Sequence, residues 1–189
     1  MIQLLPLILA LSGTGLQDVT AECAAPGNCR HVDTIHIEGA DGTARDIPID
    51  KTFPWVPDDN VMLFAGESVT VTLFEKDGAL APRLVRGGPS SIATPLKPGE
   101  IRFSLGDNEH GNILLKVESN RTDMLDYAAL MVTEHGPQRT SVCTLQPGIA
   151  VFESWQEPIL QLALWHFLPT KEPGCKTLKW GKGAHQPQS

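Results

Sequence analysis

The chain has 189 residues, with 22 acidic and 15 basic side chains and a formal net charge of −7. The only local excess of cations is three lysines near the C-terminus, at positions 176, 179 and 182. Because binding to DNA, RNA or an anionic membrane surface depends on clustered cations, this balance argues against those partners.

Residues 1–21 are predicted to be a secretory signal peptide. The segment MIQLLPLILAL is apolar except for Gln3, and it is too short to span a membrane as a helix. Small residues follow it, so cleavage is expected after Ala21, with Gly15 as a second position. A buried N-terminal strand is the alternative. The mature protein is expected in the periplasm or outside the cell, without a transmembrane helix, as one domain over residues 22–180 and a flexible tail over 181–189.

The first segments after the signal predict two β-strands separated by a turn. HVDTIHIE and RDIPI flank a turn segment that contains Gly39 and Gly42. His31 and His36 are five residues apart, so on one regular strand they point to opposite faces. They could share a metal ion only across a β-bulge.

The middle of the chain alternates between apolar and polar residues with a period of two. SVTVTLF, EIRFSL and NILLKVES show this pattern, and turn signals such as Asp77-Gly78, Pro98-Gly99 and Pro147-Gly148 separate the predicted strands. No segment keeps a 3.6-residue apolar stripe for three turns. The sequence therefore predicts an all-β fold, a sandwich or barrel of antiparallel strands, and we expect a disulfide-stabilised antiparallel β-sandwich.

One polar cluster, DNEHG, has the residue types of a metal or catalytic loop. Asp107, Glu109 and His110 lie close together in sequence, and His135 lies in a second predicted turn. A calcium loop would need more oxygen ligands at fixed spacings. A hairpin loop between the strands at 101–105 and 112–119 accounts for the same residues, so we assign no catalytic or metal-binding residue from sequence.

The spacing Asp123-x-x-x-Tyr127 resembles the tyrosine corner of immunoglobulin-like sandwiches. The resemblance covers about ten residues. It implies that the Tyr127 phenol donates a hydrogen bond to backbone across a loop. Where immunoglobulin domains have a cysteine two residues later, this chain has Ala129. An immunoglobulin-like topology is one arrangement that fits, and no immunoglobulin function follows from it.

Four cysteines in an exported chain predict disulfides. Three connectivities are possible, and sequential pairing, Cys23 with Cys29 and Cys143 with Cys175, keeps both loops local. In the chain-entropy model the larger loop, of about 33 residues, contributes about 3.5 kcal/mol and the smaller about 2 kcal/mol. The spacing within each pair is too wide for one turn to present two thiolates to a zinc ion.

The segment SVCTLQPGIAVFESWQEPILQLALWHF is predicted to form two strands joined by a short turn at Gln156–Pro158. On the second strand, Leu162 and Leu164 share one apolar face, and Trp165 shares the other with Phe167. We therefore expect this strand to be buried on both sides, with the Trp165 indole in the core.

The sequence favours a non-catalytic exported module that binds a protein, a glycan or another small ligand, without a cofactor. HExxH, Walker and Rossmann glycine motifs do not occur, and Ser68 in GESVT lacks the second glycine of a nucleophile elbow. The alternative is a hydrolase or metal-dependent enzyme whose acidic and histidine groups come from loops, with Asp107, Glu109, His110 and His135 as its candidates.

Overall fold

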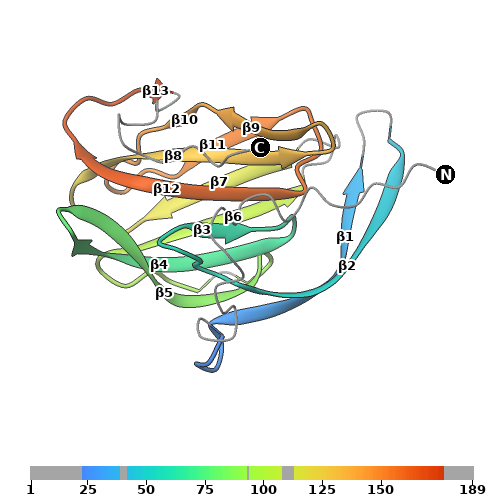
Figure 1. The fold of residues 1–189 in the computed structure, drawn as a ribbon. Helices are drawn as coiled ribbons and strands as arrows, with labels where there is room; N and C mark the ends of the chain where they lie inside the picture. The colour runs from blue at the N-terminus through green and yellow to red at the C-terminus, as the bar shows by residue number, and fades with distance from the viewer. Residues whose placement is uncertain (1–22, 39–41, 93, 108–112, 177–189) are drawn as a thin grey trace.

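The computed structural model describes residues 23–38, 42–92, 94–107 and 113–176. These residues form strands and loops, which confirms the predicted all-β class (Figure 1). The strands are β1 (Cys29–Glu38), β2 (Ala44–Pro54), β3 (Val61–Leu63), β4 (Glu67–Lys76), β5 (Ala79–Pro89), β6 (Glu100–Asp107), β7 (Ile113–Ser119), β8 (Met124–Thr133), β9 (Gly136–Thr140), β10 (Val142–Cys143), β11 (Val151–Trp155), β12 (Gln161–Thr170) and β13 (Cys175–Lys176). In this part of the chain no helix is long and apolar enough to span a membrane.

Nine strands form one curled antiparallel sheet in the order β11-β7-β6-β4-β5-β12-β8-β9, with β3 paired to β12. β5 and β12 meet only at the pair Leu80 and Phe167, so the sheet turns there from one layer into the other. Buried side chains of β4, β6 and β7 pack against those of β8 and β12 in one core. The predicted antiparallel sandwich is confirmed in this form, whereas an immunoglobulin-like strand order is not.

The alternating segments build this core as predicted. Val69 and Val71 of β4, Ile101 and Phe103 of β6, and Leu115 of β7 are completely buried. Each is separated from the next inward residue of its strand by one residue, because successive side chains of a strand point to opposite faces.

The prediction for Trp165 is wrong, because β12 contains a β-bulge. Trp165 pairs with Ala128 and Leu168 pairs with Asp126, so two residues of β12 lie opposite Tyr127 alone. The first of the two, His166, is exposed and has a φ of 58°. The extra residue reverses the alternation, so Phe167 joins Leu162 and Leu164 in the core while Trp165 stays half-buried.

The hairpin predicted for residues 141–167 is also wrong in its pairing. β11 and β12 both form, but they do not pair with each other. β11 pairs with β7 at one edge of the sheet, and β12 pairs with β3, β5 and β8. The turn signal at Gln156–Pro158 therefore marks a connection between the two layers. Turn residues alone do not show whether the strands on either side pair with each other.

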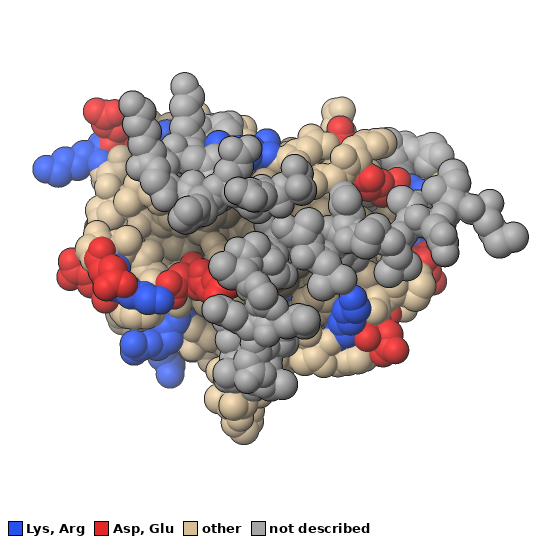
Figure 2. Space-filling model, in the orientation of Figure 1, with Lys and Arg blue, Asp and Glu red and all other residues tan. Residues whose placement is uncertain are grey.

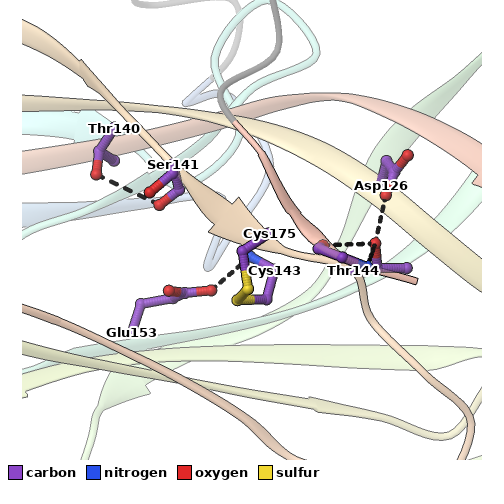
Figure 3. Close-up of a disulfide and its surroundings, with 8 residues drawn as sticks. Asp126, Thr140, Ser141, Cys143, Thr144, Glu153 and Cys175 are labelled. Atoms are coloured by element: carbon purple, nitrogen blue, oxygen red, sulfur yellow. Dashed lines mark hydrogen bonds between the residues drawn. A yellow bond between two sulfur atoms is a disulfide. The ribbon is translucent and has the colours of Figure 1, made fainter. Parts of the chain in front are cut away.

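Both predicted disulfides are present, Cys23–Cys29 and Cys143–Cys175. Figure 3 shows the second one beside the edge strand β11, where the Glu153 carboxylate accepts a hydrogen bond from the Cys143 N–H. On the other side, the Thr144 hydroxyl donates to Asp126 at 2.7 Å. Burial raises the pKa of Glu153, although the bond from the Cys143 N–H lowers it in part. The disulfide thus lies between two sets of polar side chains, Glu153 on one side and Thr144 with Asp126 on the other.

The tyrosine-corner prediction is wrong. The Tyr127 side chain is 1% exposed, and its hydroxyl has no hydrogen-bond partner among the described residues. Asp123 instead forms a bidentate ion pair with Arg121. The Tyr127 ring packs against those of Phe103 and Phe167, with centroid distances of 5.9 and 6.4 Å. Burial, followed by the nearby Glu153 charge, raises the pKa of Tyr127.

Tyr127→Phe is expected to leave the free energy of unfolding unchanged or to raise it by about 1 kcal/mol. The substitution keeps the ring contacts and removes a buried hydroxyl that gains no hydrogen bond, whose desolvation costs about 1 to 3 kcal/mol. Urea unfolding monitored by tryptophan fluorescence measures the change. A loss of more than about 1 kcal/mol would mean that the hydroxyl has a stabilising partner after all.

Glu100 is a second buried polar group, and it predicts acid sensitivity. Burial alone would raise its pKa, but the Lys97 N–H at 3.0 Å, the hydrogen bonds from Arg86 and the charge of Arg86 together lower it. A carboxylate whose pKa is lower in the folded state adds stability above its unfolded pKa, and this stability is lost as the pH falls through the folded value. Glu100→Gln should therefore cost about 2 kcal/mol at pH 7, and this difference should shrink steadily below about pH 4.5. Urea midpoints of both proteins across this pH range test it, and a difference independent of pH would contradict it.

Candidate functional site

The β1–β2 hairpin forms a long two-stranded ribbon that bends away from the sandwich (Figure 1). The two predicted strands are therefore present, and they pair with each other. Val32, Ile35 and Ile37 of β1 pack with Phe64, which follows β3, in a second, smaller apolar cluster. The opposite side of the ribbon is polar and exposed, so the ribbon presents hydrogen-bonding groups on a supported strand pair.

Arg30 of β1 fixes the base of this ribbon to the sandwich. Its guanidinium donates two hydrogen bonds to the Glu67 carboxylate, at 2.9 and 2.8 Å, and others to the backbone oxygens of Phe53 and Pro54. The guanidinium carbon lies 4.3 Å from the ring centroid of Trp55 and 5.0 Å from that of Phe64. Bidentate pairing and stacking on aromatic rings are both specific to arginine. The side chain is only 10% exposed, so the contact resists screening by water.

One cluster on the ribbon brings together a histidine and two carboxylates. The register shifts between Val32 and Thr34, with an extra residue on β2, and Asp50 there has a φ of 49°. His31 Nε2 lies 3.1 Å from Asp33 Oδ1 and 3.2 Å from Asp50 Oδ1. The other ring nitrogen, Nδ1, lies 3.3 Å from the hydroxyl of Thr52, which is directly across the ribbon. Among the described residues, His31, Asp33 and Asp50 form the only group of three ligating side chains close enough to share one metal ion.

Further along the ribbon, His36 faces its cross-strand neighbour Asp46, with Nδ1 2.6 Å from Oδ1. A groove of about 430 Å³ runs beside both histidine clusters. Side chains of the ribbon and of the adjoining sandwich line it, among them His31, Asp33, Thr34, His36, Asp46 and Glu67. The two histidines thus have separate carboxylate partners along one open groove.

A smaller hollow of about 290 Å³ lies at the other end of the ribbon, against β4 and β5. Pro54, Val56, Phe74 and Pro82 give it a more apolar lining. Arg83 at its rim stacks over Phe74, with its guanidinium carbon 4.5 Å from the ring centroid. This packing leaves no titratable cluster in the hollow, so the polar groove is the better candidate for recognition.

Of the candidate residues considered from sequence, neither Asp107 nor His135 lines the polar groove. Asp107 is the last residue of β6, and Glu109 and His110 lie outside the described residues, so the alternative enzyme hypothesis that names them stays untested. His135 is exposed in the turn between β8 and β9, as predicted for a turn residue. Ser68 is buried, and its hydroxyl lies 3.1 Å from that of Ser104 on the neighbouring strand.

Sequence reasoning missed the cluster of His31, Asp33 and Asp50 because its members come from two strands with an irregular register. Asp33 lies two residues after His31, a spacing that places both on one face of a strand, and this was the one available signal. Asp50 joins them only through the extra residue on β2.

Comparison with protein families, curated proteins and solved structures finds no match to this chain.

Proposed function

We propose that this protein is an exported, non-catalytic binding domain that recognises a protein, a glycan or another small ligand along the groove of the β1–β2 ribbon. The observation that supports this most is the groove itself, which is larger than the apolar hollow and carries exposed polar side chains of an anchored strand pair along its lining. Binding residues on a rigid scaffold are typical of recognition domains.

The groups in the groove suit recognition better than catalysis. The His36 and Asp46 side chains are 77% and 70% exposed, so water reaches them freely. Catalytic acids and bases normally need partial burial that adjusts their pKa values. Carboxylates at several points along the groove accept hydrogen bonds, which favours a ligand with many donors, such as sugar hydroxyls or basic side chains.

The surface charge and the disulfides also support the proposal. On the part of the face that is not grey, Figure 2 shows Lys and Arg side chains next to Asp and Glu, and not gathered in the broad basic patch that nucleic acids require. The two disulfides are consistent with an oxidising environment outside the cytoplasm.

The proposed signal, residues 1–21, lies outside the described residues. An intact mass that begins after residue 15 or 21, measured on protein from the periplasm or medium, would support export, and retained Met1 on cytoplasmic protein would contradict it.

The binding proposal is tested by blocking the groove. Wild type, Thr34→Trp and the control Glu172→Trp, in the exposed loop after β12, are compared on a glycan array and in pull-downs from the exported fraction. We expect a ligand that binds wild type and the control and binds Thr34→Trp at least about tenfold more weakly. The ligand should be recovered intact. Equal binding by Thr34→Trp, or a cleaved ligand, would contradict the proposal, and cleavage would favour the enzyme alternative.

A further inference from the structure

We infer that His31, Asp33 and Asp50 form a binding site for a divalent transition-metal ion of the Zn²⁺ class on the β1–β2 ribbon. This inference does not depend on the ligand proposed above. It rests on the arrangement of three donor atoms from both strands and on a fourth residue, Thr52, that orients the histidine.

The spacing of the donor atoms fits a tetrahedral ion. In a tetrahedral zinc site with bonds of about 2.0 to 2.2 Å, neighbouring ligand atoms lie about 3.3 to 3.6 Å apart. The Nε2 atom of His31 lies 3.1 Å from one Asp33 oxygen and 3.2 Å from one Asp50 oxygen, and all three atoms are within 4.8 Å of one another. Small side-chain rotations would place an ion between them. The fourth position faces solvent and would hold water.

The histidine is oriented for this role. A hydrogen on Nδ1 of His31 can be donated to the Thr52 hydroxyl, 3.3 Å away, and Nε2 then keeps its lone pair toward the two carboxylates. Metal-binding histidines commonly donate their second ring hydrogen to such a partner, which fixes the ring. Thr52 is therefore a positioning residue rather than a ligand.

The chemistry of the donors favours zinc over calcium. The two carboxylates converge on one point and repel each other, and a divalent cation would neutralise them. Calcium prefers six to eight oxygen ligands, whereas an imidazole nitrogen with two carboxylate oxygens suits Zn²⁺ and its neighbours in the first transition row. The His36 and Asp46 pair has only two such donors, which makes it a matched control on the same ribbon.

The test is a titration of the purified, disulfide-bonded protein with Zn²⁺ against a chromophoric chelator. We expect one Zn²⁺ per chain, and an association constant that falls about 10- to 100-fold in His31→Ala and in Asp33→Asn. Thr52→Val should weaken binding about tenfold, Thr52→Ser should restore it, and His36→Ala should stay within about twofold of wild type. In NMR spectra, Zn²⁺ should shift the His31 ring signals and not those of His36.

Several outcomes would overturn the inference. The inference would be wrong if wild type binds no Zn²⁺ at about millimolar metal, or if His31→Ala binds Zn²⁺ as wild type does. It would also be wrong if His36→Ala, and not His31→Ala, loses Zn²⁺ binding. The substituted side chains are exposed, 48% for His31 and 86% for Asp33, so circular dichroism should show native folding in each variant. If the protein binds Zn²⁺ but captures no ligand, the proposed function is rejected and this inference stands. If it captures a ligand but does not bind Zn²⁺, this inference is rejected and the proposed function stands.

Discussion

Phe167→Ala is expected to lower the free energy of unfolding by about 3 to 5 kcal/mol, the usual cost of removing a large buried aromatic side chain. The Phe167 ring is 1% exposed, and its centroid lies 6.1 Å from that of Phe103 and 6.4 Å from that of Tyr127. It also occupies the single point where β12 pairs with β5. Its loss would leave a cavity where the two layers join, and the neighbouring rings cannot fill it without moving the sheet.

Trp165→Ala is the matched comparison on the same strand. Trp165 is half-buried on the outer side of the bulge, so its removal should cost less than half as much as removal of Phe167. Urea unfolding of both variants and wild type measures the two changes. If Trp165→Ala proves the more costly substitution, the alternation along β12 continues without the bulge, and Trp165 rather than Phe167 belongs to the core.

Arg30→Ala is expected to cost about 3 to 5 kcal/mol as well, because it leaves a largely buried partner charge without compensation. The Glu67 carboxylate, 15% exposed, would keep its hydrogen bond from the Phe64 N–H but lose both bonds from the guanidinium. The backbone oxygens of Phe53 and Pro54 would lose a donor, and the Trp55 ring would lose its stacked cation. Thermal and urea unfolding measure the loss.

Arg45→Ala is the control for this prediction. Arg45 lies on the same ribbon and pairs with Glu134 at 2.8 Å, but its side chain is 51% exposed. An exposed pair of this kind contributes about 0 to 1 kcal/mol. Equal costs for Arg30→Ala and Arg45→Ala would show that the Arg30 pair does not anchor the ribbon.

The parts of the fold that could be predicted from sequence are those governed by local regularity. Alternation placed the inward faces of β4, β6 and β7 correctly, and the even cysteine count together with the preference for local loops led to the correct disulfides. The error for Trp165 has one cause, the residue inserted at His166. A glycine in the left-handed position can indicate a bulge in the sequence, but here that residue is a histidine. Strict alternation therefore continues past the bulge in the prediction, and it assigns Trp165 to the core face.

The candidate site could be predicted less well, because it depends on contacts between distant residues. Arg30 and Glu67 are 37 positions apart, and each alone resembles an ordinary charged surface residue. Asp50 reaches His31 only through an irregular register. Neither feature follows from spacing along the chain, since cross-strand neighbours are fixed by pairing and not by sequence separation.

The pairing of β12 with β3 has a consequence for the timing of folding. Leu162 lies opposite Leu63, so β3 cannot pair with β12 until the ribosome has added about 100 more residues. At about 5 to 20 residues per second, a ribosome needs about 5 to 20 seconds to supply it. Until then β3 lacks its pairing partner, and the part of the core that β12 supplies is missing. Such a delay is compatible with the export proposed above, in which the chain would cross a membrane before it folds.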